Sequence, residues 1–283
     1  MSKTGHLYIV ATPIGNLKDI TLRALETLKK VDLIAAEDTR HSKTLLQHYQ
    51  IDTALISLHE HNEQQRIQEL LLKLQAGQHI ALISDAGTPL ISDPGYQLVT
   101  QVRAAGLTVV PIPGPSALIA ALSAAGLPTD RFCYEGFLPA KTTARKQQLQ
   151  QLQDECRTLI FYEAPHRILD TLRDIAEVFL PQRQATLARE LTKTFETILS
   201  GTLEQLISQL LADKNQQKGE FVILVQGKKA QTSVDSAASQ RILKILLAEL
   251  PVKQAASLAA QITGEKKNEL YPLALEMKNQ HGE

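Results

Sequence analysis

Glycine, proline and acidic residues gather in four short segments within the first 116 residues. Each segment directly follows an apolar run that is typical of a buried β-strand. The segments are Thr12-Pro13-Ile14-Gly15-Asn16-Leu17-Lys18-Asp19, Glu37-Asp38-Thr39-Arg40-His41, SDAGTPLISDPG at 84–95, and Pro113-Gly114-Pro115-Ser116. In open α/β sheets, ligands bind beyond the carboxyl ends of the strands. Gly and Pro let the backbone approach a ligand closely, and carboxylates can accept protons. Four such segments at one sheet edge would form one cleft.

Each segment also fits a purely structural interpretation. Gly-Pro clusters form turns more often than ligand sites, and Asp85 fits an Asx turn that closes its own loop. Residues 37–40 fit the capped start of a helix, where acidic side chains are favoured. These alternatives stay open at this point.

Several common chemistries lack their signatures in the sequence. The motifs G-x-x-x-x-G-K-[ST], G-x-G-x-x-G and G-x-S-x-G are absent, as is any H-x-x-x-H pair among the eight His. The sequence therefore favours neither a usual phosphate or dinucleotide cradle, nor a serine hydrolase, nor a zinc protease. We expect no metal site.

The elements that must position these segments alternate between strand and helix patterns, which predicts a parallel sheet. Strands are expected over residues 7–11, 31–36, 54–58, 80–84 and 108–112. The clearest helix has Asn62 as N-cap, Gln65 three residues later as in a capping box, and Gly77 as its stop. Further helices are expected over residues 21–30, 96–105 and 117–125.

The pattern changes after Gly126-Leu127-Pro128. Strands are expected near residues 132–136, 158–162, 185–189, 194–199 and 220–225. Only Leu191-Thr192-Lys193 separates two of them, too few residues for a parallel crossover, so this sheet should be mixed. A polar linker over 231–236 precedes helices at 241–250, 252–262 and 265–278. The predicted domains are an α/β domain at 1–125, a second at 126–227, and a helical tail at 228–283.

Charge and composition limit the cellular setting. The chain has 30 Lys and Arg against 30 Asp and Glu, so no overall field draws it to nucleic acid or to an anionic membrane. The tail carries eight basic against six acidic residues, too small an excess to indicate RNA binding. No apolar run reaches the roughly 18 residues of a membrane span. The two cysteines, Cys133 and Cys156, suit a reducing compartment. We expect a cytoplasmic protein that does not enter a membrane.

Eight segments, in order, resemble the tetrapyrrole methylase superfamily of S-adenosylmethionine-dependent methyltransferases, and within it the branch that modifies small-subunit ribosomal RNA. They are LYIVATPIGNLKDIT, AAEDTRHS, SDAGTPLISDPG, PIPGPSA, DRFCYEGFLPAK, FYEAPHR, ARELTKTFE and KGEFVILVQG, between residues 7 and 227. Each motif is modest alone, but eight in order are specific. The resemblance implies two α/β domains with a cleft between them.

The resemblance also implies which residues hold S-adenosylmethionine. They are Thr12, Pro13, Gly15, Asp85, Ala86, Gly87, Thr88, Pro115, Ser116, Tyr162, Ala188, Gly219 and Glu220. Tight backbone with one or two carboxylates suits the cofactor's positive sulfonium, and Asp85 is the leading carboxylate. Tyr162 also fits plain core packing. The first loop departs from the superfamily, since Thr12-Pro13-Ile14-Gly15 keeps only the last glycine of a G-x-G-P-G-type loop.

The implied acceptor is the ribose 2′-hydroxyl of a decoding-centre cytidine in 16S ribosomal RNA. Positioning would supply most of the rate and a general base less. Catalytic candidates are Glu37 or Asp38 as proton acceptor and Arg40 or Lys193 on a flanking phosphate, with Asp93 and Glu196 nearby. Candidates for RNA binding are Arg40, His41, Lys141, Arg145, Lys146 and Lys193. For Lys141, Arg145 and Lys146, a solvated helix face is the plainer interpretation.

Two other functions compete with this one. A tetrapyrrole C-methyltransferase is disfavoured by the altered first loop, and a non-catalytic ribosome-binding protein by the four intact cleft segments. Zero net charge favours the assembled small subunit over naked RNA, because a protein with little electrostatic attraction must recognise shape. The family generally forms homodimers, so we expect a homodimer.

Overall fold

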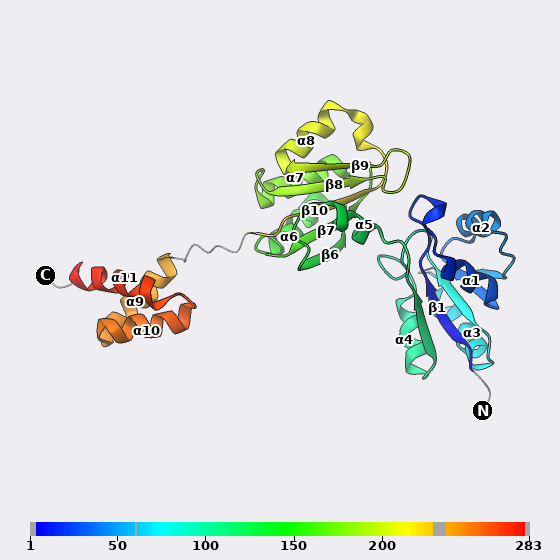
Figure 1. Cartoon of the computed structure of the whole chain (residues 1–283), viewed down its shortest axis with the longest axis horizontal. Helices are drawn as coiled ribbons and strands as arrows, with labels where there is room; N and C mark the ends of the chain where they lie inside the picture. Colours follow the sequence, from blue (N-terminus) through cyan, green and yellow to red (C-terminus); the bar gives the residue numbers. More distant parts are fainter. Residues whose placement is uncertain (1–3, 60, 229–235, 281–283) are drawn as a thin grey trace. The chain divides into compact units, whose positions relative to one another are not determined.

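The structure, a computed structural model, describes residues 4–59, 61–228 and 236–280. The chain forms two compact units, Met1–Lys228 and Lys229–Glu283 (Figure 1). The first unit contains two five-stranded sheets, and the described part of the second is helical. Most of the predicted linker lies outside the described residues.

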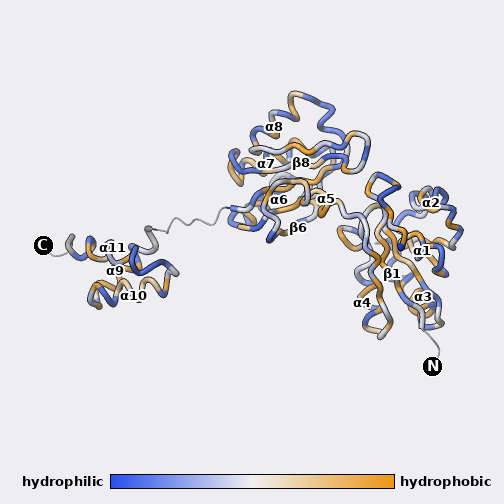
Figure 2. The backbone as a smooth tube through the Cα atoms, in the orientation of Figure 1, coloured by the Kyte–Doolittle hydropathy of each residue, from blue (hydrophilic) through white to orange (hydrophobic). Residues whose placement is uncertain are grey.

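The N-terminal sheet is parallel, as predicted, with the order β3-β2-β4-β1-β5. Its strands are β1 (His6–Val10), β2 (Leu33–Ala36), β3 (Leu55–Ser57), β4 (Ile80–Ile83) and β5 (Thr108–Ile112). The hydrophobic colour in Figure 2 runs along β1, which has a neighbour on each side. Because all five strands run the same way, their carboxyl ends and the segments that follow meet at one edge.

Helices cover both faces of this sheet. Alternate strand residues such as Val10 and Ile83 form one core with α1 (Leu22–Lys30) and α2 (Thr39–His48). The residues between them, such as Leu7 and Leu82, form another core with α3 (Glu63–Gln75) and α4 (Tyr96–Ala104). Thr21 caps α1, its side chain accepting the Ala24 N–H at 3.2 Å.

Two details of this half differ from the sequence-based expectation. The segment after β2 was expected as a loop, but Thr39 already starts α2, with Asp38 as its N-cap. The capped helix start, the alternative interpretation of residues 37–40, is therefore the observed structure. Asn62 precedes α3 but makes no capping bond to it, because its Oδ1 accepts the His59 N–H at 2.9 Å.

The C-terminal sheet is mixed, as predicted, with the order β6-β7-β10-β8-β9. Its strands are β6 (Phe132–Phe137), β7 (Thr158–Glu163), β8 (Gln184–Arg189), β9 (Thr197–Thr202) and β10 (Phe221–Val225). β6 and β7 pair in parallel, and the other pairs are antiparallel. β9 starts three residues later than expected, because residues 190–196 form turns with positive φ at Glu190 and Thr192.

The helices of this half also take both faces. α6 (Thr142–Gln151), α7 (Ile168–Phe179) and α8 (Leu203–Ala212) contribute to one core. α5 (Ala117–Ala124), hydrophobic in Figure 2, packs its Leu118 and Leu122 with Ile160 and Val222 from the sheet. The ends of the strands that pack against α5 contribute residues to the site described below.

The prediction that Arg145 binds RNA is wrong. Arg145 is only 2% exposed, and its guanidinium lies 2.6 Å from the Asp174 carboxylate. It also donates to the carbonyl oxygens of Pro139 and Ala140. Lys146 is half-buried and pairs with Asp174 and Glu177. The two side chains therefore fasten α6 to α7.

The second unit contains α9 (Ser236–Glu249), α10 (Val252–Thr263) and α11 (Lys267–Gln280). They share a small core that includes Leu243, Ala259 and Leu270. Gly264, with φ of 74°, ends α10. Among the described residues of the whole chain, no helix has both the length and the apolar content to cross a membrane.

Arg145→Met should lower the free energy of unfolding by about 3 kcal/mol, because the substitution leaves the buried Asp174 carboxylate without its main partner. Urea unfolding followed by circular dichroism measures the loss. Arg173→Met is the matched control, since Arg173 forms an exposed pair with Asp170 on the same helix, and it should change the value by less than about 0.5 kcal/mol. Equal losses in the two variants would contradict this account.

Candidate active site

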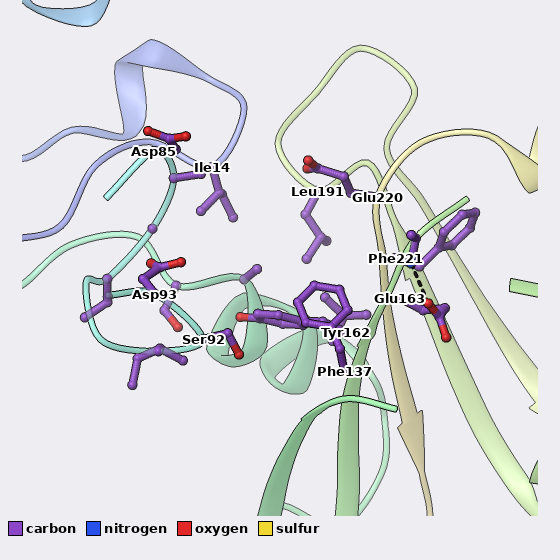
Figure 3. A pocket seen from close by; sticks show the side chains of 18 of the residues that line it. Ile14, Asp85, Ser92, Asp93, Phe137, Tyr162, Glu163, Leu191, Glu220 and Phe221 are labelled. Carbon is purple, nitrogen blue, oxygen red and sulfur yellow. Dashed lines mark hydrogen bonds between the residues drawn. The ribbon is translucent and has the colours of Figure 1, made fainter. Parts of the chain in front are cut away.

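A cavity of about 470 Å³ lies where loops of the two sheets face each other (Figure 3). The N-terminal half contributes segments that follow β1, β2, β4 and β5. The C-terminal half contributes the ends of β6, β7 and β8 and the start of β10. Of the residues expected to hold the cofactor, eight line this cavity: Asp85, Ala86, Gly87, Thr88, Ser116, Tyr162, Ala188 and Glu220. The structure therefore brings together residues that are far apart in the sequence.

The other five do not line the cavity, but they lie beside residues that do. Thr12 pairs with Gly87 through two backbone hydrogen bonds of 2.8 and 3.0 Å. The Pro115 carbonyl accepts the Thr88 hydroxyl at 3.0 Å. Pro13 lies between Thr12 and the lining residue Ile14.

Two of these five are glycines whose missing side chain makes room for a neighbour. A Cβ at Gly15 would lie 2.5 Å from Lys193 Cγ, and one at Gly219 would lie 2.4 Å from Glu190 Cγ. Both glycines therefore allow residues 190–193 to approach closely.

Several apolar lining residues were not predicted: Ile14, Ile91, Phe137, Leu191, Phe221 and Val222. Figure 3 shows Ile14 and Leu191 on opposite sides of the cavity. Phe137 is 54% exposed although it is large and apolar. The sequence did carry a signal for these lining residues, because Ile14 and Ile91 lie inside the loop segments and Phe137 lies at the end of a strand. Such positions are more often explained by packing, so the sequence does not separate them from core residues.

The cavity wall is acidic. Five carboxylates line it, and none of the described lining residues is Lys, Arg or His; the five are Glu37, Asp85, Asp93, Glu163 and Glu220. Arg167 pairs with Glu163, and Lys193 pairs with Glu220, both from outside the lining. Asp85 accepts the Asp38 N–H at 3.0 Å, so it joins two loops and does more than close its own turn. The wall favours a cationic ligand over an anionic one.

The pKa of the Asp93 carboxyl is raised above its usual value. Burial raises its pKa, a hydrogen bond with Ser84 opposes the rise, and the charge of Asp85 adds to it. The carboxyl thus holds a proton more readily than an exposed Asp. Sequence reasoning placed Asp93 near the acceptor, and the structure places it on the wall.

Asp38 and Arg40 lie at the start of α2 and do not line the cavity. Arg40 is 89% exposed and pairs with Asp38 at 2.8 Å. Hydrogen bonds from Arg40 lower the pKa of Asp38 to about 2. A carboxylate with so low a pKa is a weak base at neutral pH, which argues against Asp38 as the proton acceptor. His41 is exposed on the same turn.

Lys193 is held inside its own loop. Its Nζ lies 2.9 Å from both the Glu190 and Glu220 carboxylates. Burial opposes its charge, but the bonds to Glu220 and Glu190 outweigh burial and raise its pKa. Glu196 accepts the Thr192 N–H at 2.6 Å. These bonds stabilise the loop that carries Leu191 into the cavity wall. The Lys193 ammonium, which was predicted to contact a phosphate, is paired with Glu190 and Glu220 instead.

Tyr162 packs against neighbouring aromatic rings and also lines the cavity. Its ring contacts those of Tyr134 and Phe137, with centroids 5.0 and 5.7 Å away. Its hydroxyl accepts the Leu118 N–H at 3.1 Å, near the start of α5. Burial raises the pKa of Tyr162, so it is a neutral phenol at any physiological pH. In the described part of the chain, no three His, Cys, Asp or Glu side chains are grouped as metal ligands would be.

Comparison with known families gives two matches. Residues 6–207 match the family described as Tetrapyrrole (Corrin/Porphyrin) Methylases. Residues 233–278 match the RsmI C-terminal HTH domain. The first match spans the N-terminal sheet, all strands of the C-terminal sheet except β10, and every residue that lines the cavity except Glu220, Phe221 and Val222.

Relatives of known name match almost the whole chain. A protein of Escherichia coli O157:H7 named Ribosomal RNA small subunit methyltransferase I is 60% identical over 274 residues, with 97% of this chain and 96% of that protein covered. A Pseudomonas aeruginosa protein of the same name is 58% identical, covering 96% of this chain and 97% of that protein.

A solved structure shares the fold of the first unit. It is the uroporphyrin-III C-methyltransferase from Thermus thermophilus complexed with S-adenosylhomocysteine, and the match has a TM-score of 0.54 at 17% identity, covering 80% of this chain and 99% of that one. The family match and the full-length relatives together assign the chain to the tetrapyrrole methylase superfamily, in the family of ribosomal RNA small subunit methyltransferases I.

Proposed function

We propose that the chain transfers a methyl group from S-adenosylmethionine to the ribose 2′-hydroxyl of a decoding-centre cytidine in 16S ribosomal RNA. One observation carries the proposal. Eight residues expected at the cofactor, drawn from both sheets, line a single cavity whose wall has five carboxylates and none of whose described lining residues is basic. The names of the full-length relatives support ribosomal RNA as the substrate.

The cavity fits the cofactor in size and chemistry. Its volume of about 470 Å³ is within the range of small-molecule sites. Ile14, Leu191 and Val222 offer apolar surface for an adenine ring, and Asp85 and Asp93 offer negative charge for a sulfonium. When bound, the cofactor supplies a methyl group that bonds to the hydroxyl oxygen while the carbon–sulfur electron pair stays on sulfur. The same acidic wall repels the phosphates of the RNA.

The acceptor therefore has to present its ribose and keep its phosphates outside the wall. Arg40 and His41, exposed at the start of α2, lie three and four residues after the lining residue Glu37, and we propose that they contact the RNA backbone there. Lys141, exposed at the start of α6, is a further candidate for RNA contact. Lys146 and Lys193 are paired with carboxylates and half-buried, which weakens their case, whereas the Arg40 side chain, although paired with Asp38, is 89% exposed.

The hydroxyl proton needs an acceptor or water. Glu37 and Asp93 line the cavity, whereas Asp38 does not and has a very low pKa. We propose Glu37 or Asp93 for this role, with proton acceptance the smaller part of catalysis and alignment the larger. We also propose a homodimer that works in the cytoplasm on the assembled small subunit.

Small subunits from cells that lack the gene should accept label from radioactive S-adenosylmethionine. Nuclease digestion and mass spectrometry should find the label in 2′-O-methylcytidine. Protein-free 16S ribosomal RNA, tested in parallel, should be labelled less, because we expect the folded subunit to be recognised. If the protein binds the cofactor but labels no RNA, the RNA assignment fails, and uroporphyrinogen and precorrins are the next substrates to test.

Asp85→Asn should weaken binding of S-adenosylmethionine more than binding of S-adenosylhomocysteine, by about tenfold, because only the former carries a positive sulfonium. Isothermal calorimetry with both ligands measures the difference. Asp52→Asn is the control, since Asp52 is exposed and outside the cavity lining, and it should affect neither. Equal loss for both ligands would show that Asp85 acts through its bond to Asp38 and not through charge.

Asp93→Asn should stabilise the ligand-free protein at neutral pH by about 1–2 °C in Tm. A raised pKa means that the folded state binds the Asp93 proton more tightly than the unfolded chain does. Stability therefore falls as the pH rises from the unfolded pKa through the folded pKa, and Asn removes this loss. The gain should vanish near pH 3, where both states are protonated. A gain that is independent of pH would contradict the assignment.

A further inference from the structure

Unusual backbone conformations gather around the cavity. Six described residues other than glycine have positive φ, and four of them lie in two loops of the cavity wall: Leu90, Ser92, Glu190 and Thr192. Residues other than Gly, Asn and Asp rarely adopt positive φ, and such backbone strain persists only where neighbouring contacts stabilise it. The two loops therefore depend on contacts that keep them in place.

The loop between β4 and α4 is the more demanding one. Gly87, Leu90, Ser92 and Gly95 all have positive φ, between 67° and 119°. Residues 89–90 form a turn, and residues 92–94 make no backbone–backbone hydrogen bond in the described structure. Side chains therefore hold much of this loop: Leu90 packs against the core on one face of the N-terminal sheet, Thr88 donates to the Pro115 carbonyl, and Ser92 contacts Tyr134.

Ser92 makes the contact that joins this loop to the other sheet. Its Oγ lies 2.6 Å from the hydroxyl of Tyr134 on β6. Figure 3 shows the Tyr162 side chain reaching from that sheet toward the loop with Ser92 and Asp93, and the Tyr134 ring packs on Tyr162 with centroids 5.0 Å apart. Packing against Tyr162 therefore holds the Tyr134 ring in place where its hydroxyl contacts Ser92.

The strand that carries Tyr134 is shaped for this contact. The register of β6 on β7 shifts between Tyr134 and Gly136, as in a β-bulge. Bulges re-aim side chains and occur often beside active sites. Gly136 has φ of 68°, and a Cβ there would be 3.6 Å from Ser92 Oγ. The bulge therefore lies directly beside the contact between Tyr134 and Ser92, whose backbone has positive φ.

We propose that Tyr134 is a positioning residue, whose hydrogen bond to Ser92 holds the β4–α4 loop against the C-terminal sheet and so keeps Asp93 and the neighbouring wall in the cofactor-binding arrangement. This inference rests on the proposed function, because it takes S-adenosylmethionine as the ligand. No basic side chain from the described lining competes for Asp93, so the loop position alone decides where its charge lies.

Tyr134→Phe tests the proposal with two readouts that do not need RNA. Binding of S-adenosylhomocysteine, measured by calorimetry, should weaken about three- to tenfold, the effect of losing one neutral hydrogen bond. In the ligand-free protein, chymotrypsin should cut after Leu90 several-fold faster, as fragment masses would show. Tyr8→Phe is the matched control, since its hydroxyl bonds weakly to His6 within the N-terminal sheet and outside the cavity lining, and it should change neither readout.

A double-mutant cycle separates the hydrogen bond from a general loss of packing. Ser92→Ala should reproduce both effects, and Ser92→Ala with Tyr134→Phe should be no worse than either single change. Additive effects, or unchanged binding and cleavage in Tyr134→Phe, would overturn the proposal. If the wild type does not bind S-adenosylhomocysteine at all, the proposed cofactor fails, and the cleavage rates alone decide whether Tyr134 holds the loop. If the wild type binds it but methylates no RNA, the positioning role still stands or falls on both readouts.

Discussion

The cavity depends on the backbone pairing of Thr12 with Gly87, at 2.8 and 3.0 Å. This pair ties the loop after β1 to the loop after β4, and the Thr88 hydroxyl then ties the second loop to Pro115 after β5. Gly87 has φ of 82°, and a Cβ there would lie 3.3 Å from Ile14, so glycine suits both the turn and the contact. Three of the four chemistry-bearing segments are thereby joined before any ligand arrives. The fourth joins through the Asp38 N–H on Asp85.

The acidic wall can exist because its counter-charges lie behind it. Arg167 bonds both Glu163 and the Leu138 carbonyl, so one guanidinium neutralises a buried carboxylate and anchors the β6–α6 connection. Lys193 pairs with the half-buried Glu190 and with the exposed Glu220. The cations thus stabilise the fold from outside the lining and neutralise Glu163 and Glu220, while Asp85 and Asp93 supply the negative character that a ligand meets. A site for a cationic ligand needs this separation, since a cation inside the cavity would compete with the ligand.

Alternation of apolar runs with helix patterns was enough to predict both sheets, because buried parallel strands and capped helices have strong local signals. The stop at Gly77 could be found for the same reason. The start of α2 was only one of two interpretations of residues 37–40, since Thr39-Arg40-His41 has no apolar periodicity and only the Asp38 cap marks it. The local sequence around Arg145 is typical of a surface cation. Its burial depends on an ion pair with Asp174, 29 positions away. Phe137 and Leu191 enter the cavity through the pairing of distant strands, which no local pattern records.

The bulge in β6 has an effect beyond the cavity. β6 is an outer strand of its sheet, and an outer strand offers a row of free N–H and C=O groups to any other extended chain. The register shift at Tyr134 and Gly136 breaks that row in the middle of a strand that has exposed Phe132 and Phe137 at its ends. A flat strand with two exposed phenylalanines would be a template for aggregation, and the bulge makes β6 a poor one. The same irregularity that lies beside Tyr134 therefore also disfavours pairing of β6 with another extended chain.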